Sequence, residues 1–363
     1  GFSRMENERE KNKWRANADH HASMVEVIIL MILFFSLPLF EAPKNILSGL
    51  IIVIFLIRSV AVRSFGTPAP YDIAIWVLLA VTLISPFTSE YADQVDVFET
   101  SKHWLLIGLT ALVAGRLSYS ILQWRILMAS AIIGGVIAVS ESFWVWHFNG
   151  KIVPEFRSVG HVNHSALYMV GVLAASLGCL RDNNYWMRVL GIFGIAASFI
   201  FFIPSRSMVA MATALIISCI ALTLIMREYF ARFSFAASIL ATCLIFVGVL
   251  FTPPAQGFRS ELLYRFQGPE SLLSYRENIL FMALEVYDRN PVFGTGLRTF
   301  NIATAESVVR EELEKDGRDF EGEAENFYFN PNHGHNLWVT LLIERGFVGV
   351  LAATMYLLMG IFV

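Results

Sequence analysis

Residues 189–226 read VLGIFGIAASFIFFIPSRSMVAMATALIISCIALTLIM, two apolar runs separated by the short polar turn PSRS. A helix needs roughly 17–25 mostly apolar residues to cross a bilayer, and each run is close to that length. The stretch therefore predicts two membrane spans joined by a tight turn, with Arg206 at the turn.

The composition of the whole chain agrees with this interpretation. Of its 363 residues, 56% are hydrophobic and 16% are charged, and the mean hydropathy is +0.57. Soluble domains are about 45–50% apolar and about 25% charged. Soluble, disordered and disulfide-scaffold classes are thus excluded, and the net charge of −3 gives no basic surface for nucleic acid. We expect an all-α polytopic integral membrane protein, with Cys179, Cys219 and Cys243 as small apolar residues inside its helices.

At least ten transmembrane helices are predicted. The candidate spans are 24–40, 44–57, 71–87, 104–115, 126–146, 165–180, 188–203, 208–226, 233–251 and 347–363. The polar residues 1–23 lead into the first span without a small-residue cleavage site, so we expect that span to be retained. The last span stops at Val363 without a polar tail, which predicts at least one further helix in the natural sequence.

Basic residues fall in alternate loops, which predicts the orientation by the positive-inside rule. They occupy the N-terminal segment and then four loops, at Arg58 and Arg63, Arg116 and Arg125, Arg181 and Arg188, Arg227 and Arg232. The N-terminus is therefore expected in the cytoplasm and the long loop 252–336 outside it. We expect three parts: a transmembrane bundle of nine spans over 1–251, the loop domain 252–336, and a C-terminal segment 337–363.

The long loop has about 85 residues, and loops of that length are usually functional or disordered. Its stretch LLSYRENILFMALEVYDRNP predicts an amphipathic helix that ends before Pro291. The apolar positions that suggest this helix are Leu272, Leu273, Ile279, Leu280, Ala283, Leu284 and Tyr287. The acidic stretch 306–325 is typical of a solvated face, and we assign it no chemistry.

Several arginines are expected on the outward side, where ionisable groups near the bilayer are costly. Arg206 either anchors a helix end at the headgroups or, with Ser205 and Ser207, binds an anion at a helix start. Arg276 either forms a surface ion pair with Glu277 or Glu285 or binds an anion. The remaining outward arginines form a local basic pool: Arg157, Arg259, Arg265, Arg289 and Arg298.

Histidines also gather on the outward side, at His161, His164, His333 and His335. A metal site is disfavoured because the chain has no HExxH motif, no Asp-x-Asp motif and no cysteine-rich partner set. A histidine kept neutral by neighbouring arginines suits a general base, and a histidine that caps a loop is the alternative. Arginines at a membrane surface suggest a lipid-linked diphosphate, which they can neutralise without a metal.

Four motifs occur in order between about residues 150 and 350. They are Gly160-His-Val-Asn163, Ser205-Arg206-Ser207, Tyr275-Arg276-Glu277 followed by Asn290-Pro-Val-Phe-Gly-Thr-Gly296, and His335-Asn336 separated by nine residues from Gly346-Phe-Val-Gly349. In these motifs the chain resembles the bacterial O-antigen ligases, the WaaL group of the O-antigen ligase and polymerase superfamily.

The resemblance implies a GT-C-like helical glycosyltransferase of the bacterial inner membrane, active at the periplasmic face. Such enzymes move O-antigen polysaccharide from undecaprenyl diphosphate to the lipid A–core oligosaccharide in lipopolysaccharide biosynthesis. It implies an inverting reaction without metal or cofactor, in which Arg206, Arg276 and His335 are catalytic. His335 is the expected general base, a role that contributes about 10²–10⁴-fold. The two arginines are expected to stabilise the diphosphate leaving group.

Weaker expectations concern substrate binding. Arg157 and Arg265 are candidates for the distal phosphate, and Asn336 either orients His335 or caps the following helix. The other candidate contacts to the lipid diphosphate or the acceptor are His161, Asn163 and Ser205.

Other functions remain open at this stage. A polymerase or a protein O-oligosaccharyltransferase would use the same lipid-linked donor with another acceptor, and the closing His-Asn–Gly-x-x-Gly motif favours a ligase over both. A flippase of lipid-linked sugars would typically show paired repeats and polar groups at the bilayer midplane, whereas here the charges cluster on one side. A structural scaffold would leave Arg206 and His335 replaceable.

Overall fold

The computed structural model describes residues 21–66, 68–69, 71–94, 96–150, 153–158, 162–229, 235–252, 255–265, 276–329 and 337–362. The regular elements of this part are helices, and the chain forms two compact units. The first unit comprises Gly1–Ser64 and Leu117–Tyr264, and the second comprises Phe65–Arg116 and Arg265–Val363. Each unit is described by itself.

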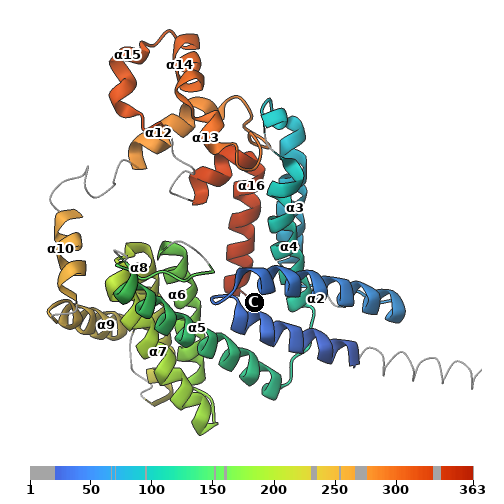
Figure 1. The fold of residues 1–363 in the computed structure, drawn as a ribbon, viewed down its shortest axis with the longest axis vertical. Helices are drawn as coiled ribbons and strands as arrows, with labels where there is room; N and C mark the ends of the chain where they lie inside the picture. Colours follow the sequence, from blue (N-terminus) through green and yellow to red (C-terminus); the bar gives the residue numbers. More distant parts are fainter. Residues whose placement is uncertain are drawn as a thin grey trace, which may run out of the picture. The chain divides into compact units, whose positions relative to one another are not determined.

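The first unit contains most of the predicted spans. Its helices are His21–Ser36, α2 (Glu41–Val62), α5 (Ile121–Asn149), α6 (Val162–Cys179), α7 (Tyr185–Ser205), α8 (Met208–Tyr229), α9 (Phe235–Leu250) and α10 (Gln256–Arg265). Helices α5 to α8 pack against one another in the green part of Figure 1.

Small residues bring α6 and α7 into close contact. A Cβ on Gly191 would lie 2.6 Å from the carbonyl oxygen of Ser176, and a Cβ on Gly194 would overlap the Ser176 hydroxyl. Helices in a bilayer associate through such close packing because burial from lipid adds little hydrophobic driving force. The two glycines of GIFG therefore explain how closely this pair packs.

Contacts between helix ends show which helices of the first unit begin or end on the same side. At one end, Arg125 near the start of α5 pairs with Asp182 in the loop after α6, at 2.7 Å, so α5 begins where α6 ends. At the other end, the Ser158 hydroxyl donates to the Leu37 carbonyl at 3.0 Å, which joins the loop after α5 to the end of the first helix. This order agrees with the alternation of basic loops in the sequence.

The second unit combines three long helices with the helices of the long loop. Helices α3 (Asp72–Ile84), α4 (Val97–Gly115) and α16 (Leu337–Phe362) run side by side in Figure 1, coloured cyan and red. The loop helices are α12 (Arg276–Tyr287), α13 (Phe300–Ala303), α14 (Glu306–Lys315) and α15 (Phe320–Glu323), and the short 3₁₀ helices are η1 (Ser85–Thr88), η2 (Ala92–Gln94) and η4 (Ala324–Asn326). Helix α12 packs on α14 and α16.

The amphipathic helix predicted before Pro291 is present as α12, but the predicted apolar face was partly wrong. Ile279 and Ala283 are buried as expected, whereas Leu280 and Leu284 are exposed. Met282 and Val286 take their place in the core with α14 and α16. Leu272 and Leu273 lie outside the described residues.

Six of the described helices are long and apolar enough to cross a membrane: Glu41–Val62, Ile121–Asn149, Val162–Cys179, Tyr185–Ser205, Ala210–Arg227 and Leu337–Tyr356. The helices His21–Ser36, Asp72–Thr88 and Ala236–Gly248 are apolar but shorter. These helices confirm a polytopic all-α membrane protein, while the count of at least ten spans stays a prediction. The last helix begins at Leu337, ten residues before the predicted span 347–363.

The compact units divide the chain differently from the predicted parts 1–251, 252–336 and 337–363. Helices α3 and α4 belong to the same compact unit as the long loop and not to the unit of the other N-terminal helices. The reason is that α3 packs along α16 and α4 packs on α3. An ion pair of 2.6 Å between Arg116 and Asp72 ties the end of α4 to the start of α3.

Helix α16 is interrupted at Gly346, whose φ of 61° and ψ of −166° are not helical. The break frees two carbonyls and two N–H groups that would otherwise bond within the helix. Residues 291–296, which we call the insertion segment, pair with all four. Thr295 N–H donates to Ile343 O at 2.7 Å and Gly296 N–H to Glu344 O at 3.0 Å, while Phe347 N–H donates to Pro291 O at 2.8 Å and Val348 N–H to Val292 O at 3.2 Å.

Glycines make this close pairing possible. A Cβ on Gly294 would overlap the backbone nitrogen of Arg345, and a Cβ on Gly346 would overlap the carbonyl oxygen of Val292. Both glycines also have positive φ, at 72° and 61°, a region that favours glycine. The glycines of NPVFGTG and GFVG thus serve one backbone junction.

We predict that Gly294→Ala destabilises the protein by about 2 kcal/mol more than Gly317→Ala, because overpacking typically costs about 1–3 kcal/mol. Gly317 is the matched control: its φ of 71° equals that of Gly294 within a degree, but a Cβ there meets nothing within 4 Å. Both variants carry the left-handed cost of about 1–2 kcal/mol. Thermal unfolding in detergent measures the difference, and equal losses would contradict the proposed role of the junction.

Candidate functional site

Arg206 lies at the turn between α7 and α8, where the chain reverses within two residues. It caps α7 in the left-handed conformation, with φ 54° and ψ 20°, and Ser207 already accepts the first bond of α8 from Met211 N–H. Ser205 is buried, and its hydroxyl donates to the Phe202 carbonyl at 2.8 Å. Ser205 thus helps to end α7, and the side chain of Arg206 is exposed.

The guanidinium of Arg206 lies against the first turn of α10. A Cβ on Gly257 would be 3.0 Å from Nη2 of Arg206. The N–H groups of a helix start and a guanidinium both attract negative charge. This end of the first unit therefore presents positive potential from two sources.

Arg157 lies near the same end of the first unit. Its neighbour Phe156 is buried against Phe201 of α7, with ring centroids 4.9 Å apart. Phe156 N–H also donates to the Ser165 hydroxyl at 2.9 Å, which fixes the turn to the start of α6. Arg157 lines a hollow of about 370 Å³ together with Glu141, Ser142, Val145, Asn149, Glu155 and Phe156.

Two carboxylates share this hollow, so Arg157 lies in a mixed environment and not in a purely basic one. Asn163 is exposed in the first turn of α6. The first unit thus brings the Arg157 turn, the start of α6 and the end of α7 to one end of its bundle.

In the second unit, Arg276 is the first residue of α12 and is exposed. The sequence predicts either a surface ion pair with Glu277 or Glu285 or an anion site. Glu285 instead pairs with Arg318 at 2.6 Å. Among the described residues no ion pair joins Arg276.

Arg289, in contrast, is neutralised. Its guanidinium pairs with Glu90 at 2.9 Å, with Glu311 at 3.0 Å and with Glu312. Burial lowers the pKa of Arg289, but the hydrogen bonds to these carboxylates outweigh it and leave the pKa raised. Arg289 therefore does not belong to the basic pool expected from the sequence.

The acidic stretch 306–325 is largely exposed, as predicted for a solvated face, and its carboxylates also form ion pairs. Besides holding Arg289, it supplies Glu306 and Glu321 to Arg310, at 3.1 and 2.9 Å, and Glu323 to Arg318. Its carboxylates hold the loop helices together through arginines.

The remaining predicted site residues lie outside the part of the chain described. They are His161, His335 and Asn336, together with the side chain of Arg265, which ends α10. Within the described residues, no group of three or more His, Cys, Asp or Glu side chains is arranged to hold a metal ion.

The sequence reasoning missed Glu344 and Arg345, two adjacent charges inside the span LLIERGFVGVL. Both are buried. The carboxylate of Glu344 accepts hydrogen bonds from the backbone N–H groups of Arg298 and Phe300, just after the insertion segment. The signal was available, because two charges inside an apolar run predict a functional or structural role.

The family model for O-antigen ligases matches residues 191–354. The match includes Arg206, Arg276 and His335, and it includes both partners of the glycine junction. No curated protein matches the chain.

We predict that Arg289→Gln lowers the free energy of unfolding by about 2 kcal/mol, since hydrogen bonds to charged groups contribute about 1.5–3 kcal/mol. Lys315→Gln is the matched control, because Lys315 pairs with the same Glu311 and Glu312. Its side chain is 54% exposed, compared with 13% for Arg289, and surface pairs contribute about 0–1 kcal/mol. Thermal unfolding at pH 7 compares the two; equal losses would contradict the inference.

The pH dependence of stability tests the same ion-pair network around Arg289. Hydrogen bonds with Arg289 and Lys315 lower the pKa of Glu311 from its usual 4.5. A carboxylate with a lowered folded-state pKa contributes stability that is present above its unfolded pKa and is lost as the pH falls through its folded pKa. The stabilities of the native protein and Arg289→Gln should therefore converge below pH 4.5.

Proposed function

Because the chain belongs to the O-antigen ligase superfamily, we propose that it is an O-antigen ligase. It transfers O-antigen polysaccharide from undecaprenyl diphosphate to the lipid A–core oligosaccharide in lipopolysaccharide biosynthesis. The observation that carries the proposal is the family match over residues 191–354, which includes all three predicted catalytic residues. The family match supports a membrane glycosyltransferase of the ligase and polymerase type, acting on a lipid-linked glycan.

The proposed reaction is an inverting in-line displacement at the anomeric carbon of the donor sugar. A hydroxyl of the acceptor forms the new glycosidic bond, and the bond from the anomeric carbon to the diphosphate oxygen breaks. His335 takes the proton of the attacking hydroxyl as general base. The diphosphate leaves with the bonding electron pair.

Arg206 and Arg276 act on the leaving group in this proposal. The diphosphate gains negative charge as its bond breaks, and guanidinium groups that meet that charge accelerate the reaction by stabilising the transition state more than the ground state. Both arginines are exposed at helix ends, in contrast to Arg289, which three carboxylates neutralise. A bidentate guanidinium neutralises a phosphate without a metal, so the proposed reaction needs neither metal nor cofactor.

The other candidate residues support binding in this proposal. Arg157 and Arg265 hold the distal phosphate, Ser205 positions Arg206 by ending α7, and Asn336 orients His335. His161 and Asn163 contribute contacts to the donor or acceptor from the start of α6. The alternation of basic loops supports this chemistry on the side of the membrane opposite the N-terminus. The likeness to O-antigen ligases supports a GT-C-like protein of the bacterial inner membrane, with that side facing the periplasm.

The decisive experiment offers the purified protein undecaprenyl-diphosphate-linked glycan in the presence of EDTA. Lipid A–core and a second lipid-linked glycan are supplied as acceptors in separate reactions. We expect product on lipid A–core alone, unchanged by the chelator. Chain lengthening on the second glycan would instead make the protein a polymerase. No product with either acceptor, while the donor still binds, would favour transport or a protein acceptor.

We predict that His335→Ala abolishes transfer in this assay and leaves binding of the lipid-linked donor intact, because only the proton acceptor is lost. His147→Ala is the matched control, since His147 is exposed in the last turn of α5 and is assigned no role. The control should transfer at the native rate. A fully active His335→Ala protein would disprove the assignment of the base.

A further inference from the structure

Among the described residues of the second unit, Arg345 is the most deeply buried charged residue that the proposed reaction does not use. It lies within the span Leu337–Tyr356 and is 1% exposed. Among the described residues, its Nε and Nη2 atoms have no hydrogen-bond partner. A charge in such a position is costly unless something pairs with it.

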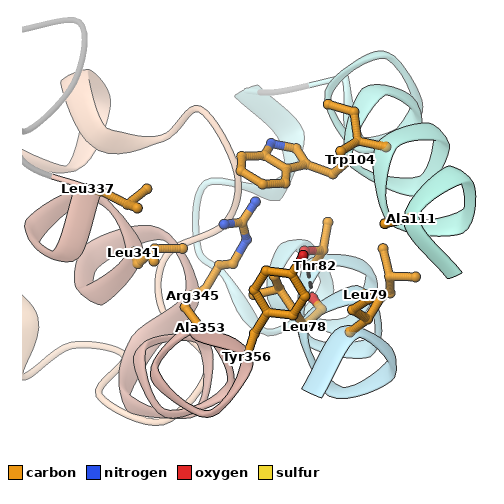
Figure 2. A pocket seen from close by; sticks show the side chains of 13 residues that line it. Leu78, Leu79, Thr82, Trp104, Ala111, Leu337, Leu341, Arg345, Ala353 and Tyr356 are labelled. Carbon is orange, nitrogen blue, oxygen red and sulfur yellow. Dashed lines mark hydrogen bonds between the residues drawn. The ribbon is translucent and has the colours of Figure 1, made fainter. Parts of the chain in front are cut away.

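The side chain reaches into a cavity of about 270 Å³ between α3, α4 and α16. Figure 2 shows the guanidinium pointing toward Trp104, with Tyr356 and Thr82 beside it. The walls are otherwise apolar, with Leu79, Ala111 and Leu341 among them. Ile107 and Leu337 also line the cavity and are more than half exposed, so it opens onto the surface of the second unit.

The neighbouring groups do not satisfy the guanidinium. Its central carbon lies 4.0 Å from the centroid of the Trp104 ring, a cation–π contact that stabilises the charge but accepts no hydrogen bond from Nε or Nη2. The Thr82 hydroxyl donates to the Leu78 carbonyl at 2.8 Å. The adjacent Glu344 directs its carboxylate to the backbone N–H groups of Arg298 and Phe300.

We propose that this cavity binds an anionic phospholipid, whose phosphate diester pairs with Arg345 and whose acyl chain lies along the apolar walls. Nε and Nη2 form one edge of the guanidinium, the edge that can donate two parallel hydrogen bonds to two phosphate oxygens.

The charge of the site selects this ligand over the lipid-linked donor. Among the described residues that line the cavity, Arg345 is the one basic side chain. A phosphate diester carries one negative charge, which a single guanidinium balances. A lipid diphosphate carries more, and the excess would be buried without a partner. The site goes beyond the proposed function and does not rest on it.

The test measures lipid binding to the full-length protein, delipidated in a non-ionic detergent, by native mass spectrometry. The probes are phosphatidylglycerol, phosphatidylcholine, undecaprenyl phosphate and inorganic phosphate. Arg345→Met removes the charge and keeps an apolar side chain of similar length. Arg227→Met is the matched control, an exposed arginine in the last turn of α8.

We expect one phosphatidylglycerol to bind the native protein and Arg227→Met with equal affinity, and to bind Arg345→Met about 10- to 100-fold more weakly. Loss of charge-assisted hydrogen bonds of about 1.5–3 kcal/mol corresponds to that range. Arg345→Lys, which keeps the charge without the two-donor edge, should bind with intermediate affinity, and it serves as the test if Arg345→Met does not fold.

Three results would overturn the proposal. Equal affinity of the native protein and both Arg345 variants would make the residue purely structural. Equal binding of phosphatidylcholine would remove the role of net charge. Displacement of phosphatidylglycerol by undecaprenyl phosphate or inorganic phosphate at lower concentration would assign the cavity to those ligands.

Discussion

The second unit depends on the exchange of backbone hydrogen bonds between the insertion segment and the break in α16. A bilayer offers no water to an interrupted helix, so each freed backbone group needs a partner within the protein. The four groups released at Gly346 find theirs in residues 291–296. The same four bonds attach the segment between α12 and α13 to α16.

The sequence predicts the helices well because their apolar runs depend on local composition, and each predicted span overlaps a helix of the structure. It predicts packing less well. Leu280 and Leu284 looked like core residues, but Met282 and Val286 fill that role because α14 and α16 cover the other side of α12. Likewise the glycines of NPVFGTG and GFVG stood out as a motif, and only the three-dimensional structure explains them as one junction.

In the candidate site, the sequence likewise does not reveal which charged residues form ion pairs with one another. Sequence identifies every arginine on the outward side but not the partner of each. Arg289 and Glu90 are 199 residues apart in the chain, and their ion pair takes Arg289 out of the basic pool. The exposure of Arg206, in contrast, follows from local sequence. A turn of two residues between two spans places its side chain at the surface of the bundle. The roles predicted for His335 and Asn336 are supported by their sequence motif alone.

Glu344 and Arg345 are adjacent in the broken helix α16, but their side chains lie in two different environments. Both precede Gly346 within one span, where an unpaired charge is costly. Glu344 receives backbone N–H groups from the chain that follows the insertion segment, so its charge strengthens the junction. Among the described residues, Nε and Nη2 of Arg345 have no hydrogen-bond partner, and its guanidinium faces an apolar cavity. A buried cation thus lies next to the junction that satisfies the backbone of α16, and the surrounding membrane contains the anions that can pair with it.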